Sequence, residues 1–295
     1  MGGLNTDLTG RVAVVTGSSK GLGAETVTLL ATMGAIPVVT YNSDADSAAA
    51  VAAAIGEAGG TAHVHRLDMG SVDSIQEFFE WLRGDDGPGG IDIFVANAAA
   101  TAFKHLIDQK PHNVDRTFAI SVTGFLEATR HCVPIMQARG GGRLVVVSGG
   151  DTRTFGPTHG LLAAAKAAME VMVQYLQVEL AGTGVTSIGV NPGVFHSDGP
   201  RLMFGELYDT IMGLVGATSP VGRVPEPAEA AQVIALACTD AAALMTGSTI
   251  VADGGDVFAK PGKLVETAFR LPRETVTELI EQMGPAPWPT PEAND

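Results

Sequence analysis

Short runs of β-branched and other apolar residues alternate with longer stretches of helical periodicity along most of the chain. The short runs, several of them bounded by glycine, predict strands at Arg11–Thr16, Ile36–Thr40, Ala62–Leu67, Ile91–Ala96, Arg143–Ser148, Val185–Val190 and Ser248–Val251. The longer stretches predict helices at Leu22–Met33, Ala45–Ala58, Val114–Ala138 and Leu161–Leu180. This alternation predicts an α/β fold with a Rossmann-type doubly wound parallel sheet and helices on both faces.

Two regions stand outside this alternation. Ser197–Pro227 interrupts it with Gly, Pro and Met, which predicts a lid over a ligand. Residues 259–295 extend past the last strand and end in a proline-rich segment, which predicts a partly irregular C-terminal extension. We therefore expect one dinucleotide-binding domain over residues 1–258, with the lid at about 197–227, and the extension after it.

Composition narrows the classes of partner. The chain has 295 residues, is 45% hydrophobic and carries a formal net charge of −14. An acidic chain without a basic stripe is a poor partner for nucleic acid or an anionic membrane. Cys132 and Cys238 lie in apolar, helix-like stretches and are predicted to be reduced core residues of a cytoplasmic protein. The seven histidines show no tight metal-ligand spacing, so no metal site is predicted.

A glycine-rich turn joins the first predicted strand to the first predicted helix. Glycines at such a turn allow the backbone to approach a pyrophosphate, whose charge meets the helix N-terminus. The turn therefore predicts a dinucleotide site formed by Gly17, Ser19, Lys20, Gly21, Leu22 and Gly23.

The end of the second strand indicates which dinucleotide binds. The strand ends in Tyr41, Asn42 and Ser43, where an NAD site usually places a carboxylate that accepts from the ribose hydroxyls. A carboxylate there would repel a 2′-phosphate, whereas the ammonium of Lys20 and neighbouring hydroxyls would hold it. The sequence therefore favours NADP(H) over NAD(H).

Several motifs in the right order resemble the short-chain dehydrogenase/reductase family over about residues 8–258. The glycine turn is similar to the family's TGxxxGxG, Asp68 to its adenine-side aspartate, Asn97 to the central asparagine of NNAG and Lys166 to the lysine of YxxxK. Asn191-Pro192-Gly193, the hydroxyl of Ser197 and the closing Asp253-Gly254-Gly255 also match. The resemblance implies further cofactor contacts from Asp68, Met69, Asn97, Ala98, Lys166, Pro192, Gly193 and Ser197.

The departures from this family concern its chemistry. Leu162 stands where the catalytic tyrosine is expected, four residues before Lys166. The serine position falls on Gly149, with Ser148 just before it, and Ser121 replaces the asparagine that holds a relay water in many members. A leucine cannot exchange a proton with a carbonyl, so the usual mechanism cannot be transferred unchanged.

One branch of the family fits better. Its enoyl-acyl-carrier-protein reductases space their tyrosine seven residues before the lysine, and Asn97-Ala98-Ala99 and Ser219–Arg223 also resemble their segments. In that register the acid position is His159, which would share one helical stripe with Leu162 and Lys166. Histidine titrates near neutral pH and is a plausible acid, although His159 can equally be a loop residue before the helix. The candidate catalytic residues are His159, Lys166 and Ser148.

Substrate contacts are expected in the loop after the fifth strand, where this fold builds its ligand crevice. The candidates are Asp151, Thr152, Phe155 and Leu162. In the family Lys166 also bonds the nicotinamide ribose, a role that does not need the tyrosine. Helices such as Val114–Ala138 and the Lys166 helix pack against symmetry mates in this family, so a homodimer or homotetramer is expected.

Three functions stay open at this level. The first is reduction, with NADPH, of an enoyl or keto substrate that is a small molecule, carrier-bound or a secondary-metabolite intermediate. The proton would come from His159, a water or the substrate itself. The second is a non-redox reaction, such as cyclisation, dehydration or isomerisation, in the cofactor crevice. The third is a non-catalytic partner subunit that keeps the dinucleotide as a structural ligand.

Overall fold

The computed structural model describes residues 4–156, 158–197, 199, 201, 204–259, 272, 274 and 275. Most of the predicted C-terminal extension and four positions in the predicted lid (198, 200, 202 and 203) therefore lie outside the described residues. In the described part no helix is both long enough and apolar enough to cross a membrane.

The described residues form one seven-stranded sheet in the order β3-β2-β1-β4-β5-β6-β7, and each neighbouring pair of strands is parallel. The strands are β1 (Val12–Val15), β2 (Ile36–Tyr41), β3 (His63–Arg66), β4 (Ile93–Ala96), β5 (Gly142–Val147), β6 (Val185–Asn191) and β7 (Thr249–Val251). This order confirms the predicted Rossmann-type α/β fold. The direction of winding reverses between β1 and β4, and a ligand crevice is expected beyond the carboxyl ends of those strands.

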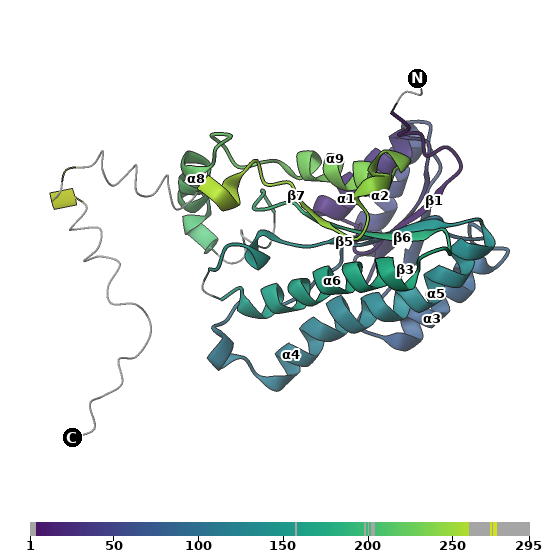
Figure 1. The fold of residues 1–295 in the computed structure, drawn as a ribbon, viewed down its shortest axis with the longest axis horizontal. Coiled ribbons are helices and arrows are strands. Elements are labelled where there is room, and N and C mark those ends of the chain that lie inside the picture. Colours follow the sequence, from purple (N-terminus) through teal and green to yellow (C-terminus); the bar gives the residue numbers. More distant parts are fainter. Residues whose placement is uncertain are drawn as a thin grey trace.

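Helices cover both faces of the sheet (Figure 1). One face carries α1 (Gly21–Thr32), α2 (Ala45–Glu57) and α9 (Pro227–Ala237), whose apolar residues join one core cluster. The other face carries α3 (Val72–Arg83), α5 (Gly124–Ala138) and α6 (Gly160–Glu179), which join a second cluster. The described residues also form α4 (Pro111–Phe118), α8 (Tyr208–Thr218) and the 3-10 turns Leu106–Asp108, Gly150–Thr152, Gly205–Leu207 and Asp240–Met245.

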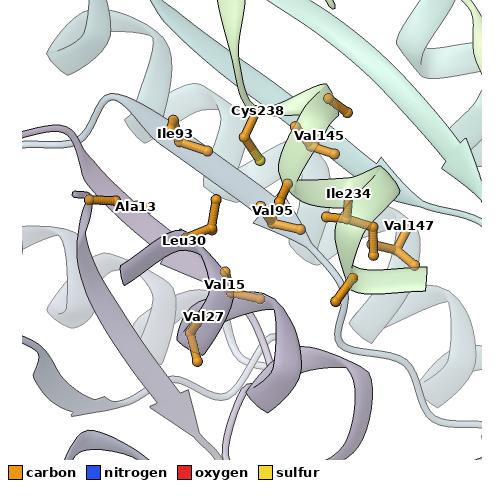
Figure 2. Packing of buried hydrophobic residues seen from close by; sticks show 14 of the residues in the cluster. Ala13, Val15, Val27, Leu30, Ile93, Val95, Val145, Val147, Ile234 and Cys238 are labelled. Carbon is orange, nitrogen blue, oxygen red and sulfur yellow. The ribbon is translucent and has the colours of Figure 1, made fainter. Parts of the chain in front are cut away.

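The two core clusters explain why the strands are apolar without a gap. Alternate residues of a strand point to opposite faces, and in this sheet both faces are covered. Figure 2 shows Val27 and Leu30 of α1 and Ile234 of α9 packed against strand residues such as Val15 and Val95. Their neighbours on the same strands face the second cluster. The continuous β-branched runs are thus the signature of a buried parallel sheet.

One predicted helix is interrupted. The segment predicted as a single helix over Val114–Ala138 divides into α4, a π-helical turn at Ala119–Thr123, and α5. A β-carbon on Gly124, the first residue of α5, would collide with the carbonyl oxygen of Met69. The helix therefore contacts the backbone of the loop after β3 at this point. Three further helices of the described residues, α3, α8 and α9, are not among the predicted elements.

Candidate active site

A cavity of about 760 Å³ opens at the carboxyl ends of the strands. The glycine turn after β1 lines one part, and the segment between β5 and α6 lines another. Most of the predicted site residues line this one cavity: Gly17, Ser19, Lys20, Gly21, Leu22, Gly23, Tyr41, Asn42, Ser43, Asp68, Met69, Asn97, Ala98, Ser148, Asp151, His159, Leu162, Lys166, Gly193 and Ser197.

The glycine turn has the shape that a dinucleotide needs. Gly17 has a φ of +64° and lies against Ala98, and a β-carbon on Gly23 would collide with the carbonyl oxygen of Gly17. The turn is tied to the loop after β4, because the Thr16 hydroxyl accepts hydrogen bonds from the backbone N–H groups of Asn97 (2.9 Å) and Ala98 (2.8 Å). This compact turn at the N-terminus of α1 fits the pyrophosphate of a dinucleotide.

The rim beside β2 holds charges of both signs. Lys20 is exposed there, and Asn42 accepts hydrogen bonds from the guanidinium of Arg66 at its backbone oxygen (3.1 Å) and its side chain (3.3 Å). Asp44 also lines the cavity, but its carboxylate caps α2 by accepting from the N–H of Ser47. Sequence reasoning missed Arg66 and Asp44, because neither lies in the strand tip that distinguishes the two cofactors.

Lys166 lies deep in the cavity wall. The residue is 5% exposed, and its Nζ donates a hydrogen bond of 2.6 Å to the carbonyl oxygen of Val147 at the end of β5. Burial lowers the pKa of Lys166 to about 8, and the negative charge of Asp151 opposes part of this shift. Lys166 is therefore a cation whose charge depends on pH near the physiological range.

His159 immediately precedes α6 and faces the cavity from the start of that helix. Its Nδ1 lies 3.6 Å from Oδ2 of Asp151, and its ring centroid lies 5.1 Å from that of Phe103. The preceding residue, Thr158, has a φ of +69°, which is strained for a β-branched side chain. The chain thus adopts an uncommon backbone conformation just where it brings His159 to Asp151.

Asp151 fills the place of a missing side chain. Gly149 occupies the position of the family's catalytic serine, and a β-carbon there would lie only 2.5 Å from Oδ1 of Asp151. The backbone of Gly149 is extended (φ −153°), so its conformation does not require glycine. Oδ1 of Asp151 is buried and has no hydrogen-bond partner among the described residues. The carboxylate therefore lies where the serine side chain would start.

The hydroxyl of Ser148 is engaged elsewhere. Ser148 lines the cavity, but its hydroxyl donates to the buried carboxylate of Glu170 on α6. The same carboxylate accepts from Thr152 (2.8 Å) and forms an ion pair with Arg153 (2.7 Å). This network fastens the loop after β5 to α6. Glu170 was not among the predicted site residues, since only the fold brings it next to Ser148.

Three predicted residues do not line the cavity. Thr152 is held by Glu170, as described above. Phe155 is 91% exposed, because the loop that carries it turns outward after the 3-10 turn at Gly150–Thr152. Pro192 lies beside the cavity, but only its neighbour Gly193 contributes to the lining. Of the three side chains expected from the loop after β5, only Asp151 lines the cavity, and Thr154 of the same loop, which was not among the candidates, lines it as well.

Part of the cavity wall is apolar. It is formed by Phe103, Ile120, Leu162, Val194, Phe195, Phe204, Met212 and Val215. Met212 and Val215 belong to α8, within the segment predicted as a lid. That segment therefore contributes to the cavity wall, and its closure over a ligand stays a prediction.

Comparison with known proteins identifies the same scaffold. Residues 17–256 match a protein-family model described as Enoyl-(Acyl carrier protein) reductase. The chain is 33% identical over 276 residues to 1-cyclohexenylcarbonyl-CoA reductase of Streptomyces collinus, a match that covers 90% of this chain and 95% of the relative. It is 32% identical over 250 residues to cis-4-hydroxycyclohexanecarboxylate dehydrogenase of Sinomonas cyclohexanicum, with coverage of 83% and 96%.

Among solved structures, the angucycline C-6 ketoreductase LanV with bound NADP is similar, with a TM-score of 0.76 and 30% identity. That match covers 85% of this chain and 97% of LanV. The reductase LugOII, which catalyses keto-reduction at C1 during lugdunomycin biosynthesis, has a TM-score of 0.77 and 30% identity. Here the coverage is 85% of this chain and 99% of LugOII.

Proposed function

The chain belongs to the short-chain dehydrogenase/reductase family, and we propose that it reduces an enoyl or keto substrate with NADPH, using His159 in place of the usual tyrosine. Its relatives of known activity are reductases and dehydrogenases, and the chain is an oxidoreductase of this family. The observation that carries the proposal is that one cavity brings together the glycine turn, Lys166 and His159, while Leu162 and Gly149 offer no acid.

The residues divide the work between binding and proton transfer. When bound, NADPH supplies the hydride. Lys166 is buried beside the cavity and holds a positive charge that suits the nicotinamide ribose. The imidazolium of His159 gives its proton to the substrate, at the oxygen of a ketone or at the enolate left by an enoyl group. The neutral imidazole then recovers a proton from solvent.

The choice of NADPH is supported by the rim beside β2. Lys20 and Arg66 lie near Asn42 and Ser43, and a 2′-phosphate would meet positive charge there. Asp44 reduces this preference, although its carboxylate is already engaged with Ser47. LanV, a structural relative, binds NADP. NADPH is therefore the cofactor to test first.

The substrate class follows from the apolar wall and the relatives. Phe103, Leu162 and Met212 contribute to a surface that fits a ring better than a charged or sugar-like group. The relatives include enzymes named for cyclohexenylcarbonyl-CoA, for a hydroxycyclohexanecarboxylate and for angucyclines. We therefore infer a cyclic substrate whose carbonyl or conjugated double bond is reduced, either carrier-bound or an intermediate of secondary metabolism.

The test is loss of NADPH absorbance with a panel of substrates. The panel contains cyclic and acyclic enoyl thioesters, the matching keto thioesters and polycyclic aromatic ketones. We expect stoichiometric NADPH oxidation with a cyclic member and weak activity with NADH. If the purified protein binds NADPH but oxidises it with no member, reduction is not its function. Product formation that does not depend on the redox state of the cofactor would establish a non-redox reaction instead.

A further inference from the structure

We propose that Asp151 is a positioning residue that holds His159 as the proton donor, so that an aspartate–histidine pair replaces the serine and tyrosine of the family. The inference rests on the role proposed above for His159. It assigns Asp151 to the histidine rather than to the substrate.

The space beside Gly149 links the absence of the serine to Asp151. Oδ1 of Asp151 lies 2.5 Å from the place where a side chain at position 149 would begin. A serine at position 149 would therefore force the Asp151 carboxylate out of its observed position. Since the extended backbone of Gly149 permits any residue, the carboxylate, and not backbone strain, accounts for the glycine. The absence of a serine at position 149 and the presence of the Asp151 carboxylate beside it are thus linked.

The charges around His159 also favour its pairing with Asp151. His159 lies at the N-terminus of the 20-residue helix α6, where the helix dipole disfavours a cation. On the same helix Lys166 adds a positive charge that interacts with Asp151. The other charged pair of this region, Arg153 and Glu170, is satisfied by its own contact, and Phe103 is uncharged. Asp151 brings a negative charge within 3.6 Å of the imidazole and is thus placed to stabilise its protonated form.

The orientation of the His159 ring indicates which of its nitrogens would donate to the substrate. Nδ1 of His159 lies 3.6 Å from the carboxylate, while the ring also contacts Phe103. A neutral imidazole in this setting carries its proton on Nδ1, towards Asp151. The proton that reaches the substrate is then the one on Nε2 of the imidazolium. Its N–H bond breaks as a new O–H or C–H bond forms on the substrate, and the ring is left neutral with Nδ1–H facing Asp151.

The kinetic experiment uses Asp151→Asn, His159→Gln and the double variant, with Asp85→Asn as the control. Asp85 is an exposed loop carboxylate between α3 and β4, away from the cavity. Asp151→Asn should lower kcat roughly 10–100-fold, the range found when residues that orient functional histidines are removed, with little change in KM. Asp85→Asn should leave both unchanged.

The double variant separates positioning from a general structural effect. If Asp151 acts through His159, the double variant should be no slower than His159→Gln alone. Losses that multiply would show that Asp151 acts independently of the histidine. An unchanged kcat in a folded Asp151→Asn variant would also overturn the proposal.

A spectroscopic readout does not need turnover. The ¹⁵N chemical shifts of His159 in the wild-type protein, assigned by comparison with His159→Gln, report which ring nitrogen carries the proton. We expect the Nδ1–H tautomer in the neutral ring, and a shift towards Nε2–H in Asp151→Asn. An Nε2–H tautomer in the wild type would overturn the pair even if the protein reduces its substrate. The Nδ1–H tautomer without any NADPH oxidation would refute the proposed function but keep the pair.

Discussion

Two aspartates lie at opposite ends of the sheet, Asp92 with a side chain 3% exposed and Asp151 with one 11% exposed, and their surroundings differ. Asp92 precedes β4 and accepts hydrogen bonds from the N–H of Val12 (2.8 Å) and from two nitrogens of Arg139 (3.0 and 2.9 Å), with Arg11 at 3.4 Å. Asp151 follows β5 and lies 3.6 Å from His159, and its Oδ1 has no hydrogen-bond partner in the described part of the chain. One carboxylate is fully satisfied, whereas the other is not.

This difference fits a structural role for Asp92 and the positioning role proposed for Asp151. Burial of Asp92 opposes its ionisation, but the hydrogen bonds from Arg139 and Val12 outweigh this and lower its pKa below the ordinary value of 3.8. That carboxylate joins β1, β4 and the end of α5. Asp151 joins no strands, and a half-satisfied buried carboxylate costs stability. Such a cost is expected where a residue is retained for chemistry rather than for folding.

The largest expected effect is on activity at the second of these sites. His159→Ala should reduce kcat by about 10²–10⁴-fold, because the proposed proton donor is lost while the binding surface is kept. Steady-state NADPH oxidation with the active member of the substrate panel measures it. His112→Ala, an exposed histidine on α4, is the control. Full activity of His159→Ala would mean that water or the substrate supplies the proton.

Loss of the charge should change the stability of the fold much more at Asp92 than at Asp151. Asp92→Asn should destabilise the fold by about 2–3 kcal/mol, since it breaks a buried, bidentate pair whose arginines regain some water. Asp151→Asn should change the free energy of unfolding by less than about 1 kcal/mol. Urea denaturation of both variants measures this difference. Equal destabilisation would show that Asp151 is structural too.

The pH dependence of the same measurement sharpens the comparison. The folded-state pKa of Asp92 is lowered, so its contribution is present above pH 3.8 and is lost as pH falls through the lowered value. The stability gap between wild type and Asp92→Asn should therefore narrow in acid.

The sequence predicts the sheet well and the site in part. The buried strands appear as unbroken apolar runs, and the glycine turn and Lys166 are found from local motifs. The spacing of seven residues to Lys166 points to His159. Asp151 was expected only to touch the substrate, because its contact with His159 depends on how the loop after β5 folds over Gly149. The glycine itself, at the serine position, was the available signal.

Other features have no local signal. Glu170 meets Ser148 across 22 residues of sequence, and Arg66 reaches Asn42 from the neighbouring strand. The π-helical turn adds one residue to a long helix and leaves its apolar periodicity nearly intact. The dimer or tetramer stays a prediction. Val171, Tyr175 and Val178 form an exposed stripe on α6 that such an interface would bury.

A restoration experiment tests whether the aspartate replaced the serine. Leu162→Tyr with Gly149→Ser should gain little activity by itself, because the new serine and the observed Asp151 carboxylate compete for the same space. Adding Asp151→Ala should permit carbonyl reduction through the new tyrosine, reduced by strain of roughly 1–3 kcal/mol from the larger ring. Ketone reduction by all three proteins measures it. Equal gains in ketone reduction with and without Asp151→Ala would show that the carboxylate does not hinder a serine at position 149.

A smaller effect is expected at the cofactor rim. Lys20→Ala should weaken NADPH binding by roughly 10–100-fold and NADH binding much less, because a charge-assisted contact to the 2′-phosphate contributes about 1.5–3 kcal/mol. Fluorescence titration with both cofactors measures the ratio. Equal losses would show that Lys20 does not discriminate, and Arg66→Ala would then be the variant to compare.

The smallest effect concerns Lys166 and pH. Its pKa is lowered to about 8, so the ammonium predominates below that pH and is lost as pH rises through it. NADPH binding should weaken across this range by severalfold at most. In Asp151→Asn the midpoint should fall further, because Asp151 opposes the effect of burial. A midpoint that does not respond to Asp151→Asn would separate the carboxylate from Lys166.

The most direct measurement of the central claim is the pH dependence of kcat in wild type and in His159→Gln. If His159, held by Asp151, donates the proton, wild-type kcat falls as pH rises through the range in which an imidazole loses its proton. His159→Gln should then be slow and show no such fall. Two profiles of the same shape and similar height would contradict the account.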